Sequence, residues 1–179
     1  CDNTDGIGLC NDLNRLLQKV GNQLERSRIL ILGAGGAAQG VIHPLLQAKV
    51  EHISIWNRTY EKAQQLKAVF PSVHPLTNEE LLKQPPFDLI INATAAGLAG
   101  ESPLSSAAVI NVFSPSSFAY DMVYGKDTQF MRDAKELGLM ASDGLGMLVE
   151  QAADAFMTWR KPSVALDINA AIAAARATY

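Results

Sequence analysis

The chain has 179 residues, of which 48% are hydrophobic and 18% are charged. Its 18 acidic and 15 basic side chains give a formal net charge of −3. This length and hydrophobicity suit a folded domain of ordinary size and exclude a disordered chain. The mild acidity and the absence of basic blocks argue against nucleic-acid binding by charge. No apolar run reaches the roughly 20 residues of a membrane-spanning helix, so we predict no membrane partner.

The first ten residues carry little sign of processing or of metal binding. They lack the basic and apolar regions of a signal peptide. Cys1 and Cys10 form neither a disulfide framework nor a repeated metal pair, which favours a reducing, cytoplasmic setting. The chain begins with cysteine instead of methionine, so we expect a piece of a longer protein.

Short apolar runs along the chain predict the strands of a buried parallel sheet. They lie at residues 28–32, 52–56, around 73–74, 87–92, 118–122 and 139–142. Segments with helical periodicity or composition alternate with them, at residues 11–20, 37–48, 60–70, 77–83 and 130–137. This alternation predicts an α/β fold, a Rossmann-like doubly wound parallel sheet with helices on both faces.

Several details of these elements are also predicted. Pro44 removes a backbone donor from the second helix and is expected to kink it. Thr59 is a plausible N-cap of the third helix. Residues 93–117 are rich in Gly, Ser, Pro and Ala, and we interpret them mainly as loop. Two helices close the chain: one has an apolar stripe that includes Phe156 and Trp159, and an alanine-rich one covers residues 164–178.

A glycine-rich turn follows the first predicted strand and opens the first helix of the sheet region. It has the form G-x-G-x-x-A, with Gly33, Gly35 and Ala38 at the defining positions. The first glycine permits a tight turn, the second lets the backbone approach a pyrophosphate, and the small third residue allows close packing. The helix dipole and the free N–H groups then favour phosphate. The predicted cofactor-binding residues here are Gly33, Ala34, Gly35, Gly36 and Ala37, although such turns also occur for packing alone.

The end of the second predicted strand indicates which nucleotide is bound. An NAD site usually has an acidic residue there, whereas this chain has Asn57, Arg58 and Thr59, followed by Lys62. Arg58 offers a planar fork for a 2′-phosphate and a flat face for adenine, while Thr59 and Lys62 add a hydroxyl and a point charge. The pattern favours NADP as the cofactor. A helix cap with solvated charges is the simpler alternative.

Six separated motifs, in order, resemble shikimate dehydrogenase. They cover almost the whole chain up to about residue 160: Asn3-Thr-Asp-Gly6, Gly33-Ala-Gly-Gly-Ala37, Asn57-Arg-Thr59, Asn92-Ala-Thr94, Tyr120-Asp-Met-Val-Tyr124, and Asp143-Gly-Leu-Gly-Met147 followed by Gln151. The sequence departs from the family pattern at Ala95, where a serine is frequent, and at Gln129, where a proline is common.

The resemblance implies reduction of 3-dehydroshikimate to shikimate by hydride transfer from NADPH, in the pathway to aromatic amino acids. Asp5 resembles the aspartate of a catalytic lysine–aspartate pair, and Tyr124 and Gln151 resemble substrate-binding residues. Met122 and Gly144 resemble positions around the nicotinamide. From the residues alone, Asp5 would be the N-cap of a helix beginning near Ile7. Gln151 would then be a solvated helix residue, Met122 a core residue and Gly144 part of a turn.

The resemblance also implies an absence. The family places its substrate domain, with the catalytic lysine, before the Asn-Thr-Asp-Gly motif, and no lysine of this chain has a matching context. We therefore expect the cofactor-binding half of the enzyme, inactive alone. Its predicted parts are a hinge helix at 1–20 with the catalytic aspartate, an NADP-binding domain at 21–143, and helices at 144–179 that return to the substrate domain. Without that domain, the face bearing Phe156 and Trp159 is expected to be exposed or covered by another copy in a homodimer.

Other functions remain open from the sequence. One is a quinate/shikimate dehydrogenase that uses NAD, and another is a stand-alone, non-catalytic module that binds NADP. His43, His52 and His74 are scattered, and no neighbouring carboxylate or cysteine joins them into a metal site, so we predict packing or surface roles for them.

Overall fold

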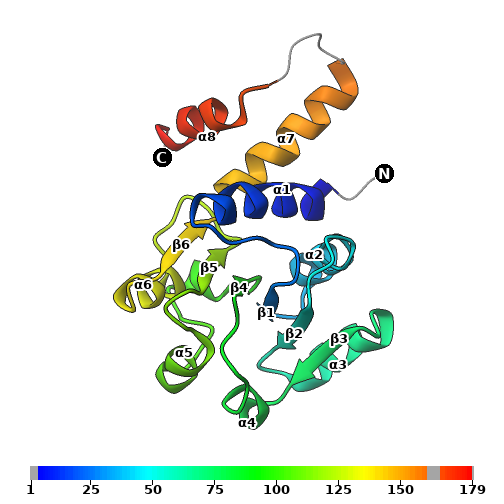
Figure 1. Ribbon diagram of the computed structural model, residues 1–179, viewed down its shortest axis with the longest axis vertical. Coiled ribbons are helices and arrows are strands. Elements are labelled where there is room, and N and C mark those ends of the chain that lie inside the picture. Colours follow the sequence, from blue (N-terminus) through cyan, green and yellow to red (C-terminus); the bar gives the residue numbers. More distant parts are fainter. Residues whose placement is uncertain (1–3, 161–165, 179) are drawn as a thin grey trace.

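A six-stranded parallel sheet forms the centre of the computed structural model, which describes residues 4–160 and 166–178 (Figure 1). The strand order is β3-β2-β1-β4-β5-β6, and every neighbouring pair is parallel. The strands are β1 (Arg28–Leu32), β2 (His52–Trp56), β3 (Val73–Leu76), β4 (Leu89–Asn92), β5 (Phe118–Asp121) and β6 (Met140–Asp143). This is the order of a doubly wound dinucleotide-binding sheet, so the predicted fold class is confirmed.

Two hydrophobic clusters cover the two faces of the sheet. Ile29 and Ile31 of β1 belong to the first cluster, and Leu30 and Leu32 belong to the second, because successive side chains of a strand point to opposite faces. The first is covered by α1 (Thr4–Lys19), α2 (Gly36–Gln47) and α3 (Tyr60–Val69), and the second by α4 (Asn78–Leu81), α5 (Ser106–Val112) and α6 (Gln129–Glu136). Both faces are therefore buried, which explains why the central strands are continuous apolar runs.

The first helix of the chain, α1, packs above the sheet against α7, the last but one (Figure 1). Helix α7 (Leu145–Arg160) crosses α1, and α8 (Ile168–Arg176) packs on α7. Small residues permit the close approach: a Cβ at Gly8 would lie 2.7 Å from Cγ of Gln151 and 2.8 Å from the carbonyl oxygen of Met147. At Gly6, a Cβ would lie 2.9 Å from the carbonyl oxygen of Gly40 on α2. The segment before β1 is thus fixed to two other helices.

The structure corrects one local prediction and bears on two others. Helix α1 begins at Thr4, so Asp5 lies in its first turn and does not cap a helix that starts near Ile7. Helix α2 continues through Pro44, so the proline does not end the helix, and the expected kink stays a prediction. Thr59 occupies the N-cap position of α3, as predicted, but its side chain makes no capping hydrogen bond.

Residues 93–117 are mainly loop, as predicted, but they also hold two helical segments that were not predicted. They contain helix α5 and the short 3₁₀ helix η1 (Ala96–Ala99). The side chain of Ser105 accepts a hydrogen bond from the N–H of Ala108 and so caps α5. A helix of only seven residues is too short for a clear helical period, which explains the error.

Parts of three predictions fall on residues that the structure does not describe, namely Cys1, Asn3 and the start of the last predicted helix at Val164. The three proposed domain boundaries stay predictions. Among the helices of residues 4–160 and 166–178, none combines the length and the apolar character needed to cross a membrane.

Candidate cofactor site

The turn between β1 and α2 requires a glycine at its first position. Gly33 has φ +106°, a conformation that side-chain-bearing residues rarely adopt. Its N–H donates a 2.8 Å hydrogen bond to the carbonyl oxygen of Trp56 at the end of β2. A Cβ here would lie 3.0 Å from Cγ2 of Thr94 and 3.1 Å from the carbonyl oxygen of Ala93. The turn is therefore built by three strand ends in close contact.

The start of helix α2 is open to solvent and suits an anion. Gly35 is its extended N-cap and provides no side-chain hydrogen bond, and the first turn contains no acidic residue. A Cβ at Gly35 or Gly36 would meet no atom within 4 Å. The first N–H groups of a helix lack intrahelical acceptors, and the dipole adds positive potential. A phosphate can therefore approach this backbone closely.

A pocket of about 660 Å³ lies over this helix start, at the carboxyl ends of β1, β2 and β4. It brings together eight of the eleven residues that the sequence assigned to the cofactor: Gly33, Ala34, Gly35, Gly36, Ala37, Asn57, Arg58 and Lys62. Thr59, Met122 and Gly144 are not among its lining residues. The pocket thus unites the glycine turn with the two cations expected to select the nucleotide.

The end of β2 presents those cations from a defined turn. The side-chain amide of Asn57 donates a 2.8 Å hydrogen bond to the carbonyl oxygen of Thr59, and the N–H of Lys62 donates to the same oxygen. Arg58 is exposed and lies between these bonded residues, while Lys62 is in the first turn of α3. Both cations line the pocket from one side.

A buried polar network supports the loops on the other side of the pocket. Asn92, at the end of β4, accepts hydrogen bonds from the N–H and the hydroxyl of Thr94 and donates to Asp121 at 3.1 Å. The carboxylate of Asp121 also accepts from the Thr128 hydroxyl at 2.6 Å and from the N–H of Val123 at 3.0 Å. Burial raises the pKa of Asp121, and these donors oppose the shift. The network fixes the chain just after β4 and β5.

The residues predicted to flank the nicotinamide meet at the ends of β5 and β6. Met122 follows β5, and its N–H donates to the carbonyl oxygen of Asn92 at 3.0 Å. A Cβ at Gly144 would clash with the carbonyl oxygen of Met122. The two residues contact each other at the carboxyl ends of the strands, the same end of the sheet that carries the pocket. Strand β5, which Met122 follows, is the second strand from β1 on this side.

The predicted substrate-binding residues lie on three different segments. Asp5 is exposed in the first turn of α1, and Gln151 lies on α7 against Gly8 of α1. Tyr124 is 41% exposed in the loop after β5. The packing of α1 on α7 therefore brings Gln151 to the half of α1 that carries Asp5.

The pocket has further lining residues that the sequence analysis did not assign. They are Trp56, Ala93, Thr94, Ala95, Ala96, Glu101, Ser102 and Pro103. Ligands in doubly wound sheets bind where the connections from two neighbouring strands diverge, here between β1 and β4. The loop after β4 could therefore have been predicted to line the pocket. Trp56 was interpreted only as the end of an apolar strand, and no signal pointed to residues 101–103.

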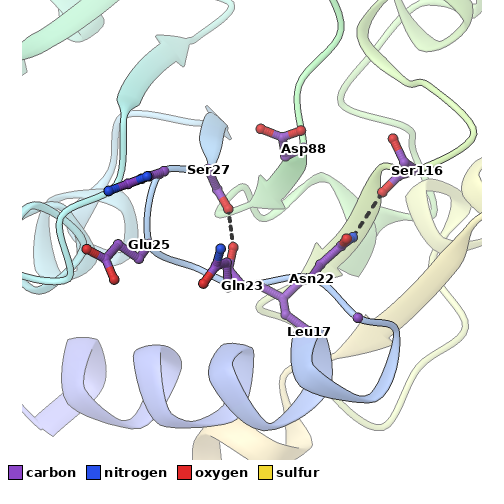
Figure 2. Close-up of a pocket in the computed structure, with 9 residues that line it drawn as sticks. Leu17, Asn22, Gln23, Glu25, Ser27, Asp88 and Ser116 are labelled. Atoms are coloured by element: carbon purple, nitrogen blue, oxygen red, sulfur yellow. Dashed lines mark hydrogen bonds between the residues drawn. The ribbon is translucent and has the colours of Figure 1, made fainter.

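A second hollow, of about 260 Å³, lies near the opposite end of the strands, as Figure 2 shows. Its polar groups largely bond one another: Asn22 donates to the carbonyl oxygen of Ser116, and Ser27 donates to that of Gln23 at 2.6 Å. Asp88 accepts from the N–H of Arg28. None of the predicted site residues lines this hollow.

Two of the three histidines form a packing contact. The rings of His52 and His74 stack with centroids 4.2 Å apart, and Nε2 of His52 lies 3.0 Å from Oγ of Ser54. Across residues 4–160 and 166–178, no group of three or more histidine, cysteine, aspartate or glutamate side chains is placed to share a metal ion.

The sheet order, the glycine turn and the pocket define a dinucleotide-binding α/β domain. A model of the family described as shikimate / quinate 5-dehydrogenase matches residues 15–104, and the chain belongs to this family.

Relatives and solved structures agree with this assignment. The chain is 52% identical over 162 residues to a shikimate dehydrogenase (NADP(+)) of Vibrio campbellii, covering 89% of this chain and 56% of the relative. It is 48% identical over 162 residues to the one of Legionella pneumophila subsp. pneumophila, covering 89% and 57%. A crystal structure of shikimate 5-dehydrogenase from Thermus thermophilus in complex with NADP(H) and shikimate is similar with a TM-score of 0.79, at 32% identity, over 98% of this chain and 62% of that chain. The chain therefore spans less than two thirds of the length of these proteins.

Proposed function

We propose that this chain is the cofactor-binding part of an NADP-dependent shikimate dehydrogenase, which reversibly reduces 3-dehydroshikimate to shikimate. One observation carries the proposal: the glycine turn, Arg58 and Lys62 line a single pocket at the carboxyl ends of the strands. The relatives named above are shikimate dehydrogenases that use NADP(+), and a similar structure contains NADP(H) and shikimate.

The charged residues of the pocket are the cations Arg58 and Lys62 and the carboxylate of Glu101, and the two cations suit NADP. The open space over Gly35 and Gly36 admits a pyrophosphate, which the N–H groups at the start of α2 would bind. The guanidinium fork of Arg58 and the ammonium of Lys62 suit a 2′-phosphate. Met122 and Gly144 would flank the nicotinamide from the ends of β5 and β6. When bound, NADPH supplies the hydride for the reduction.

Asp5, Tyr124 and Gln151 are the residues we assign to the substrate. A carboxylate at Asp5 can orient a substrate hydroxyl and, with a lysine partner, control its proton. Gln151 can hold a second polar group, because it lies against the same helix. In this proposal the glycine turn binds the cofactor, and residues of the α1–α7 helix pair bind the substrate.

Titration calorimetry with NADPH and NADH tests the cofactor assignment. We expect the 179 residues to bind NADPH more tightly than NADH, and to show no turnover of 3-dehydroshikimate alone. In a protein of the relatives' full length, Asp5→Asn should abolish reduction while leaving NADPH affinity unchanged. Equal affinity for the two nucleotides would favour an NAD-dependent quinate/shikimate dehydrogenase instead. Tight NADPH binding without activity at full length would favour a non-catalytic module.

We further propose that two copies associate through the terminal helices in the cytoplasm. Phe156 is 43% and Trp159 is 81% exposed on α7, which is unusual for large apolar side chains. A cytoplasmic location suits the free thiol of Cys10. Sedimentation of the chain and of its Trp159→Glu variant tests the dimer, since the substitution should yield monomers. Sedimentation as a monomer before substitution would exclude it.

A further inference from the structure

Trp56 is a large aromatic residue at the carboxyl end of β2. It is the last residue of the strand, and it lines the same pocket as the glycine turn and Arg58. Its ring is partly buried and packs against the second hydrophobic cluster, on the face covered by α4 and α5. Trp56 therefore lines the pocket with its ring on the face opposite to α2 and α3, where it also borders a hollow of about 320 Å³ with Asn78 and Leu81.

A hydrogen bond to the start of α4 fixes the indole. Its Nε1–H donates a 2.8 Å hydrogen bond to Oδ1 of Asn78, the first residue of α4. That helix start is itself held by a capping box, in which Thr77 and Glu80 bond each other's backbone N–H groups at 3.2 and 2.8 Å. Trp56 is thus a positioned wall of the pocket.

The position of Trp56 along the sheet identifies the half of the nucleotide that it faces. The phosphates belong over β1, and β2 lies on one side of β1 while β4, β5 and β6 lie on the other. Arg58, two residues after Trp56, is the group suited to a 2′-phosphate, which only the adenosine half carries. Ser102 and Pro103 also line the pocket, and the Ser102 hydroxyl is anchored to Asp133 at 2.6 Å.

We propose that Trp56 is the aromatic wall against which the adenine ring of the cofactor packs. The proposal rests on the proposed NADP site and adds a residue that recognises the base. An indole offers a large, rigid apolar surface, and aromatic side chains pack favourably on every base. Arg58 then selects the phosphate and Trp56 binds the base beside it.

Fluorescence of a chain with a single tryptophan tests this directly. The chain has two tryptophans, and Trp159 is 81% exposed on α7, outside the pocket. In the Trp159→Phe variant, emission reports on Trp56 alone. We expect adenosine 2′,5′-bisphosphate to quench this emission at saturation, and nicotinamide mononucleotide to leave it unchanged.

Substitution of Trp56 measures its contribution to affinity. Trp56→Leu should weaken binding of adenosine 2′,5′-bisphosphate about tenfold in calorimetry, and Trp56→Phe only about twofold, since a ring is retained. Circular dichroism checks that both variants fold. Calorimetric binding without any change in Trp56 emission, or equal losses in the Leu and Phe variants, would overturn the role of Trp56 but leave the NADP site standing. Failure of the unsubstituted chain to bind NADPH or the bisphosphate would reject both.

Discussion

The hydroxyl of Tyr120 donates a 2.8 Å hydrogen bond to the carboxylate of Asp12, and both side chains are fully buried. Tyr120 is on β5 and Asp12 is on α1, so the bond ties the first helix to the sheet. Burial, followed by the charge of Asp12, raises the pKa of Tyr120 well above its usual value, which keeps the hydroxyl protonated as a donor. Arg15 forms an ion pair with the same carboxylate. Because α1 also carries Asp5, this cluster holds in place the helix that bears the proposed catalytic carboxylate.

Loss of this buried carboxylate should destabilise the fold strongly. Asp12→Ala leaves Arg15 without its charge partner and Tyr120 without its acceptor, and we expect a loss of about 3–5 kcal/mol in the free energy of unfolding. Tyr120→Phe keeps the ion pair and should cost about 1–2 kcal/mol. Urea denaturation measures both. Asp154→Ala, at an exposed position on α7, is the matched control; a loss in Asp12→Ala no larger than in this control would contradict the prediction.

Two glycine-to-alanine substitutions should separate folding from cofactor binding. At Gly8 a methyl group would clash with Gln151 and Met147, and we expect about 1–3 kcal/mol of destabilisation. At Gly36 the methyl group meets no protein atom and enters the pocket. The unfolding free energy of Gly36→Ala should therefore lie within about 0.5 kcal/mol of that of the unsubstituted chain, or above it, because alanine favours helix.

The same Gly36→Ala variant should lose NADPH affinity. A methyl group forced into a packed contact costs about 1–3 kcal/mol, or roughly 5- to 150-fold in the dissociation constant. Calorimetry with NADPH on Gly36→Ala and on Gln39→Ala gives the comparison, since Gln39 is an exposed residue of the same helix outside the pocket. Unaltered NADPH affinity in a folded Gly36→Ala protein would show that the phosphates bind elsewhere.

Arg58 should determine the choice between NADPH and NADH. Arg58→Ala removes a charge-assisted contact with the 2′-phosphate, and we expect NADPH affinity to fall about tenfold or more with NADH affinity unchanged. Lys67→Ala removes an equal charge from the last turn of α3, outside the pocket, and serves as control. An unchanged ratio of NADPH to NADH affinity in Arg58→Ala would refute this role.

Local patterns predicted the sheet and the glycine turn because those signals lie within short stretches of sequence. Alternating strands and helices were sufficient to predict a doubly wound parallel sheet, although not its strand order, and G-x-G-x-x-A located the turn whose first glycine has positive φ. Helix α5 was missed because its seven residues hold less than two helical periods, and its cap at Ser105 stood in a run rich in serine and proline.

The unpredicted parts of the pocket depend on contacts between distant segments. Trp56 becomes a pocket wall only because Asn78, 22 residues later, holds its indole. Ser102 reaches the pocket because its loop is anchored to Asp133, 31 residues away. The periodicity of a single segment does not predict such long-range bonds. The ends of neighbouring strands are predictable neighbours, because the sheet itself brings them together.

Acidification should weaken the fold through the stacked histidines. Burial, then the charge of His74 and that of Arg28, lowers the pKa of His52 below 6.5. The folded chain therefore binds a proton at His52 more weakly than the unfolded chain, so this contribution to stability is present above pH 6.5 and is lost as the pH falls through the folded-state pKa. His52→Gln should make the fall in unfolding free energy between about pH 7 and pH 5 less steep.

His74→Gln should raise the pKa of His52, measured by NMR titration of its ring protons, because the neighbouring charge is gone. An unshifted His52 titration in that variant would show that His74 does not lower the pKa of His52.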